Sequence, residues 1–304
     1  MSIVFNKKLE NPNEGEKKTV YSGSYADTPD NRVVRIPEGI EEIAENAFRD
    51  FSCLEEIYLP RSLVRISAAA FSGCSSLRKV VMENGLAVIG DEAFSSCPSL
   101  TGINMPDTVR FIGEGAFEGC ASLTSLRLSE SLYSIGSNAF AFCFNLPAVT
   151  VPDSCVSVET CAFSSCFSLE SVKLSDNIAA LDESVFEGCR SLKYVDLPVR
   201  LRKIGRRAFR GCSSLQSIIL PVGVESLGFD AFCDCKSLSR IAIPKGLCEV
   251  EDLELFSGCD SLDTVSFGGS AERWSYILSG DTLTVTHSDL SVSTPKMIFL
   301  DLKE

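Results

Sequence analysis

The single histidine is the residue of this sequence best suited to acid-base catalysis. It is His287, near the C-terminus, and a Ser-His-Asp or Cys-His site would have to be built around it. The numerous serines, such as Ser75 and Ser213, follow turns, where a hydroxyl satisfies backbone groups of the same chain. We therefore predict no catalytic residue and a protein that is not an enzyme.

The fourteen cysteines are the other candidates for chemistry, as metal ligands or in disulfides. A metal site needs ligands that converge on one point, and the C-x-C pair of Cys233 and Cys235 has no histidine beside it. Free cysteine packs as a small hydrophobic residue, so a buried column of thiols is favoured over a disulfide framework, and no metal or cofactor is expected. Nine cysteines occupy one position of a repeat: Cys74, Cys97, Cys120, Cys143, Cys166, Cys189, Cys212, Cys235 and Cys259.

That repeat is marked by a phenylalanine every 23 residues, three positions before each of these cysteines. A repeat of this length is one unit that cannot bury its own apolar face, so successive copies must stack around a shared core. We predict a solenoid with a phenylalanine spine; an aromatic stripe that binds a ligand is the alternative. The column contains Phe48, Phe71, Phe94, Phe117, Phe140, Phe163, Phe186, Phe209 and Phe232, and Phe256 follows after a step of 24.

Each copy contains the elements of one coil. In residues 116–138, Leu126 and Leu128 are spaced by two, which is the period of a strand. Proline often ends this strand, as Pro106 does one copy earlier, because it lacks an amide hydrogen. A second extended piece follows, and then a glycine, here Gly136, which is expected to turn the chain through a positive φ into a short α-helical or 3₁₀ turn.

The repeat resembles a known family. The segment LQSIILPVGVESLGFDAFCDC, residues 215–235, is similar to the BspA-type or Treponema pallidum-type leucine-rich repeat, and the resemblance covers residues 33–268. It implies an α/β, horseshoe-like solenoid of about ten 23-residue coils, with a parallel sheet on one face and short helical or 3₁₀ turns. It also implies adhesion or host contact, and it carries over no catalytic residue because the motif consists of packing residues.

The two ends depart from the repeat. We predict an N-terminal arm and cap at residues 1–32, the solenoid at 33–268 and a C-terminal cap at 269–304. A capping strand is expected within residues 19–25, and Trp274 is expected to pack within a short helix instead of stacking on a ligand. Alternating residues at 283–285 and the apolar run 297–302 predict added strands.

Charge and composition exclude some classes of partner but leave the location of the protein open. A net charge of −13 argues against nucleic acid, which needs an excess of clustered lysine and arginine. No apolar run approaches the roughly 20 residues of a membrane helix, so no membrane insertion is expected. The resemblance implies a cell-surface or secreted protein, whereas the absence of a secretory signal in residues 1–18 and the free thiols fit the cytoplasm equally well.

One basic run stands out in this acidic chain, between Arg200 and Arg210. Adding or subtracting one repeat places four of its arginines beside carboxylates of neighbouring coils, so these pairs would neutralise the run. A docking patch for an anionic partner is the alternative. The predicted pairs are Arg206 with Glu183, Arg210 with Glu187, Arg202 with Glu225, and Arg207 with Asp230.

The outward positions of the main strand vary while the core positions do not, which favours them as a recognition surface. We predict a non-enzymatic module that binds a protein or glycan through this face; a structural or self-associating spacer is the alternative, and the sequence leaves the oligomeric state open. A merely solvated face is an equally good interpretation of the same residues. The candidates are Tyr58, Val81, Asn104, Arg127, Thr150, Lys173, Tyr194, Asp196, Ile219 and Arg240.

Overall fold

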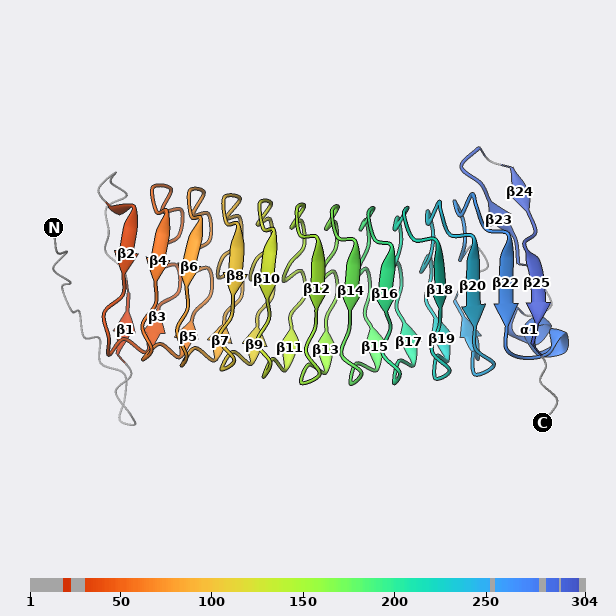
Figure 1. The fold of residues 1–304 in the computed structure, drawn as a ribbon, viewed down its shortest axis with the longest axis horizontal. Coiled ribbons are helices and arrows are strands. Elements are labelled where there is room, and N and C mark those ends of the chain that lie inside the picture. Colours follow the sequence, from red (N-terminus) through yellow and green to blue (C-terminus); the bar gives the residue numbers. More distant parts are fainter. Residues whose placement is uncertain (1–18, 23–30, 252–254, 279–282, 290, 301–304) are drawn as a thin grey trace.

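The chain forms one stack of coils, shown in Figure 1, in a computed structural model that describes residues 19–22, 31–251, 255–278, 283–289 and 291–300. Each coil supplies one longer strand to a front row and one two-residue strand to a second row. The front row contains β2 (Val33–Arg35), β4 (Glu56–Tyr58), β6 (Lys79–Val81), β8 (Gly102–Asn104), β10 (Ser125–Arg127), β12 (Ala148–Thr150), β14 (Ser171–Lys173), β16 (Tyr194–Asp196), β18 (Ser217–Ile219), β20 (Arg240–Ile243) and β22 (Thr264–Phe267). The second row contains β1 (Val20–Tyr21), β3 (Glu42–Ile43), β5 (Arg65–Ile66), β7 (Val88–Ile89), β9 (Phe111–Ile112), β11 (Ser134–Ile135), β13 (Ser157–Val158), β15 (Ala180–Leu181), β17 (Lys203–Ile204), β19 (Ser226–Leu227) and β21 (Glu249–Val250).

All strands of the stack pair in parallel, and the repeat length sets their register. Ile57 lies opposite Val34 on one side and Val80 on the other, so each step along the stack is one repeat. Between β20 and β22 the step lengthens by one residue, with Ile241 opposite Val265, as the longer last spacing of the phenylalanines requires. The predicted leucine-rich repeat solenoid with a parallel sheet is confirmed.

The phenylalanine column is the predicted spine. All rings from Phe71 to Phe256 are fully buried, and neighbouring rings stack with centroids 4.9 Å apart at Phe48 and Phe71 and 5.9 Å apart at Phe232 and Phe256. Tyr21 of β1 adds a further ring at 5.4 Å from Phe48. This spacing matches the hydrogen-bonding distance of a sheet, so backbone pairing and ring stacking reinforce each other.

The segment around each phenylalanine consists of hydrogen-bonded turns, not of the expected helical turn. Around Phe48, the amide of Arg49 donates to the Asn46 carbonyl (3.1 Å), but the Phe48 amide donates to Ala70 of the next coil (2.7 Å). Asn46 (φ 55°) and Asp50 (φ 58°) adopt left-handed backbone two residues before and after the ring. Because helix needs a continuous run of negative φ, this alternation excludes it and directs every second amide to the neighbouring coil.

The recurring glycine before this segment also differs from expectation. Gly113 and Gly136 are not among the positive-φ residues, so the predicted left-handed turn at this position is wrong. A Cβ on Gly113 would lie 2.6 Å from the Asp91 amide nitrogen and 2.7 Å from the Gly90 carbonyl carbon. Glycine is needed here because adjacent coils approach too closely for a side chain.

The front row is divided into separate sheets. Hydrogen-bonded pairing joins β2 to β10, β12 to β16, and β18 to β25, but it does not cross from β10 to β12 or from β16 to β18. The wider spacing at these two places is visible in Figure 1. The second row is interrupted once, between β13 and β15. The turns beside the phenylalanines stay bonded across the two breaks of the front row, as from the Phe186 amide to Ala208 (2.9 Å), so at those two places the coils open at the front alone.

The ends carry the predicted kinds of elements. Helix α1 (Ala271–Ile277) begins at Ser270, whose hydroxyl caps it, and buries Trp274 against Phe267 with centroids 4.9 Å apart. Strands β23 (Val285–Thr286) and β24 (Val292–Ser293) form a hairpin, and β25 (Lys296–Phe299) pairs with β22. The predicted capping strand appears as β1, while residues 1–18 of the arm and 23–25 lie outside the described part.

Candidate functional site

The ten predicted binding residues lie on the front strands from β4 to β20, with their side chains outward. Tyr58 and Val81 are partly buried, whereas the other eight are exposed, and Tyr194 and Ile219 reach 72% and 78% exposure. Because the front row is divided, these residues fall into three groups instead of forming one continuous surface.

The first group is centred on Tyr58, whose polar contacts are made within the protein. Its hydroxyl donates to Glu56 Oε2 (2.6 Å) and accepts from Lys79 Nζ (3.1 Å), and the Arg35 guanidinium lies 3.6 Å from the ring centroid. The hydrogen bond from Tyr58, and then the charge of Lys79, lower the pKa of the Glu56 carboxyl. This end of the face is therefore a fixed, internally satisfied cluster.

Arg127 of the same sheet is also held in place. Its Nη2 contacts both carboxylate oxygens of Asp107 (2.9 and 3.0 Å), and its Nη1 donates to the Met105 carbonyl (2.7 Å). Asp107 also accepts from the Glu130 amide, and this bond, followed by Arg127, lowers the pKa of the Asp107 carboxyl. The guanidinium has few donors left for a partner.

The most accessible candidates belong to the second and third groups and lie where β16 and β18 fail to pair. A hollow of about 500 Å³ separates the two strands, with Tyr194 and Asp196 on one side and Ile219 on the other. Lys193, Gln216 and Ser217 also line the hollow, and they are not among the residues predicted from the sequence. No signal in one repeat could have found them, because the hollow arises from the separation of two coils.

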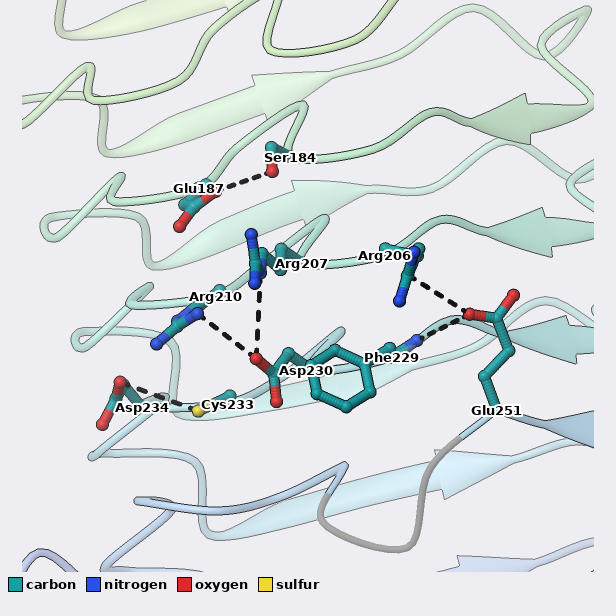
Figure 2. A network of polar contacts seen from close by, with 10 residues as sticks. All are labelled: Ser184, Glu187, Arg206, Arg207, Arg210, Phe229, Asp230, Cys233, Asp234 and Glu251. Carbon is teal, nitrogen blue, oxygen red and sulfur yellow. Dashed lines mark hydrogen bonds and ion pairs between the residues drawn. The ribbon is translucent and has the colours of Figure 1, made fainter.

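Four of the six cations of the basic run form ion pairs, and Figure 2 shows those of Arg206, Arg207 and Arg210. Two predicted pairs are present, Arg202 with Glu225 (2.9 Å) and Arg207 with Asp230 (3.8 Å). The other two predictions are wrong.

Arg210 contacts Asp230 (3.2 Å) and Arg206 contacts Glu251 (3.6 Å), which lies two coils further along. Glu187, the expected partner of Arg210, instead accepts from the Ser184 hydroxyl (2.6 Å). An arginine side chain is thus long enough to pair with a carboxylate that is not exactly one repeat away in the sequence.

The nine repeat cysteines form the predicted buried column. Each thiol donates to the carbonyl of the phenylalanine of the preceding coil, as Cys166 does to Phe140 (3.2 Å). Burial raises the pKa of the Cys120 and Cys166 thiols to about 12, which keeps them protonated and unreactive near neutral pH. All fourteen cysteines are free thiols, and no group of three or more metal-binding residues occurs in the described part of the chain.

His287 lies near a serine and an aspartate in the C-terminal cap. Its Nε2 is 2.7 Å from Ser293 Oγ, but its Nδ1 is 3.8 Å from Asp260 Oδ1, beyond hydrogen-bonding distance. Asp260 instead accepts from the amide (2.8 Å) and the hydroxyl (2.7 Å) of Ser288. Asp260 therefore ties the hairpin to the last coil and does not orient the imidazole as a catalytic triad requires.

Comparison with known proteins identifies the repeat. The family model described as "BspA type Leucine rich repeat region (6 copies)" matches residues 18–146, 87–214 and 179–277, which together span most of the chain. No curated protein matches the sequence.

Several solved structures are similar. A leucine-rich repeat protein from Bacteroides ovatus has 22% identity and a TM-score of 0.48, over 98% of this chain and 99% of its own. A leucine rich cell surface protein from Faecalibacterium prausnitzii has 24% identity and a TM-score of 0.45, over 87% and 93%. The leucine-rich repeat protein of T. pallidum has 28% identity and a TM-score of 0.46, over 64% and 88%.

Proposed function

From the premise that the chain belongs to the BspA-type leucine-rich repeat family, we propose that it is a non-enzymatic recognition module acting in adhesion or host contact. It binds a protein or glycan partner through the outward side chains of the front strands. Because the BspA-type repeat is found in many bacterial surface proteins, we also propose a cell-surface or secreted location. No helix in the described residues is long and apolar enough to cross a membrane.

The observation that carries the proposal is the exposed group at the separation of β16 and β18. Tyr194 and Ile219 are among the most exposed large apolar side chains of the described residues, and they border a hollow rimmed by Lys193 and Asp196. An aromatic anchor beside a concave surface with a polar rim is the usual composition of a protein-binding hot spot. The clusters around Tyr58 and Arg127, which are held by internal contacts, would form a rigid part of the strand face away from Tyr194 and Ile219.

A binding screen against immobilised extracellular-matrix proteins and glycans tests the proposal. The double variant Tyr194→Ser and Ile219→Ser should lose at least about 30-fold in affinity for any partner found, because truncation of hot-spot residues costs about 2 kcal/mol or more. The control is Val199→Ser with Val222→Ser, which removes equally exposed apolar side chains (66% and 86%) from the turns after the strands. Equal loss in both double variants would contradict the proposal.

The spacer alternative makes a different prediction. A self-associating protein should show a scattering mass that rises with concentration, and the rise should be insensitive to both double variants. Concentration-dependent association without any partner in the screen would favour the spacer over the recognition module.

A further inference from the structure

A trough floored by three successive glycines lies along the second row of strands, away from the ten candidate residues. Gly90, Gly113 and Gly136 occupy the same position of three consecutive coils, and they line a hollow of about 500 Å³. In the flanking coils this position holds Ser67 and Glu159, which also line the hollow and close its two ends. Since three coils span about 14 Å, the trough has room for about four residues of extended chain.

One side of this trough is apolar. Val88 and Phe111 precede the glycines by two residues and are register partners in the second row. Phe111 is 39% exposed, and its ring meets the exposed ring of Tyr133 edge to face, with centroids 5.8 Å apart. Exposed apolar side chains that gather in a hollow indicate a contact surface.

The other side carries negative charge that the protein does not neutralise. Asp91 and Glu114 follow the glycines directly, and Asp91 Oδ1 accepts from the Glu114 amide (2.9 Å). At the closed end, Glu159 Oε2 accepts from the Ser137 amide (3.2 Å). These donors are uncharged, and none of the three carboxylates forms an ion pair within the described residues. Against them the lining offers one cation, Arg65, which leaves two uncompensated negative charges.

Further along the stack, a cation of the protein itself lies beside the glycine position. There, Gly205 and Gly228 occupy the glycine position, and Arg206 follows the first of them. The Arg206 guanidinium lies 5.5 Å from the Phe229 ring centroid and 3.6 Å from Glu251 Oε2, as Figure 2 shows for the carboxylate contact. There a basic side chain contacts both an aromatic ring and a carboxylate. At the trough the Arg110 guanidinium lies 5.8 Å from the Phe111 ring centroid, but among the described residues no cation forms an ion pair with Asp91 or Glu114.

We propose that the glycine trough binds a short extended segment of a protein partner in which basic and apolar residues alternate. Successive side chains of an extended chain point to opposite sides. Apolar side chains would therefore pack on Val88 and Phe111, while lysine or arginine side chains would reach Asp91 and Glu114. This site is separate from the strand face and does not depend on the function proposed for it.

Fluorescence anisotropy with a labelled (Lys-Val)₃ hexapeptide tests the proposal on the full chain. The peptide should bind at low salt, (Glu-Val)₃ should not bind, and binding should weaken as salt screens the charges. The double variant Asp91→Asn and Glu114→Gln should weaken binding about 2- to 30-fold through the loss of two exposed ion pairs. Phe111→Ala should weaken it about 2- to 5-fold because the valines of the peptide lose apolar contact with the ring.

The matched control is Asp176→Asn with Glu130→Gln. Asp176 caps the Val199 amide (3.2 Å) as Asp91 caps Glu114, so the control makes the same chemical change outside the trough. Hydrogen exchange of the unmodified protein should show protection by (Lys-Val)₃ at residues 87–91 and 110–114.

Failure of (Lys-Val)₃ to bind, equal binding of (Glu-Val)₃, equal loss in the control, or protection elsewhere would each overturn the proposal. Binding of neutral maltotetraose at the trough in place of the peptide would overturn it in favour of a glycan site. Strand-face variants such as Tyr194→Ser should leave peptide binding unchanged, so the two proposals fail separately.

Discussion

Truncation of one ring in the middle of the phenylalanine column should destabilise the solenoid strongly. Phe140 is fully buried and stacks on Phe117 and Phe163 with centroids 5.2 and 5.4 Å apart. Phe140→Ala removes the buried ring, leaves a cavity and breaks both stacking contacts, each worth about 0.5–1.5 kcal/mol. We expect the free energy of unfolding to fall by about 3–5 kcal/mol, in the upper half of that range because both ring faces are covered.

Guanidinium unfolding followed by far-UV circular dichroism and by fluorescence measures this loss. The only tryptophan, Trp274, lies in the C-terminal helix and reports on that end of the stack. Because the core of each coil packs only on the neighbouring coils, a weak central coil should separate the two signals into distinct transitions.

The control for this experiment lies two residues away. Phe142 is 41% exposed and touches Phe144 at its edge, with centroids 6.2 Å apart. Phe142→Ala removes the same ring from the surface and should cost less than about 1 kcal/mol. If Phe140→Ala cost no more than Phe142→Ala, the column would not be the spine of the fold.

Three further predictions concern the glycine position, the thiols and the basic run. Gly113→Ala should lower the free energy of unfolding by about 1–3 kcal/mol because its Cβ would clash with the preceding coil, whereas Gly119→Ala, at φ 70° with no neighbour closer than 3.8 Å, should lower it by about 1 kcal/mol. Thermal unfolding compares the two variants, and equal losses would contradict the role of Gly113 in close approach. Burial raises the pKa of the Cys166 thiol from 9.0 to about 12, so between these pH values the folded state holds a proton that the unfolded state releases. The free energy of unfolding should therefore fall progressively as the pH rises from 9 to 12. Urea unfolding at several pH values measures this fall, and Cys166→Ala should make it smaller. Asp230→Asn should lower the free energy of unfolding by about 1–3 kcal/mol because this carboxylate is only 13% exposed and forms ion pairs with two arginines. Glu225→Gln should lower it by less than about 1 kcal/mol because Glu225 is 55% exposed. Chemical denaturation measures both, and the opposite ranking would show that burial does not decide the strength of these pairs.

The candidate site was only partly predictable. The rule that equivalent residues lie one repeat apart placed all ten candidates on the front strands and found the partner of Arg202. It failed for Arg206 and Arg210 because a long side chain can reach carboxylates other than the one at the equivalent position of the adjacent coil. It also could not foresee which strand-face groups are already engaged in internal contacts, as Tyr58 is, and which remain accessible.

The sequence by itself determined the stack, its register, the ring column and the buried thiols. Those follow because a strict period and the spacing of sheet hydrogen bonds leave each apolar residue one place to pack, between its own copies. Only the tertiary structure decided that the coils separate at the front between β16 and β18, that the turns are not helical, and that glycine serves close approach. The physical reason is that these features depend on how neighbouring backbones fit together, and a single copy of the repeat does not specify that fit.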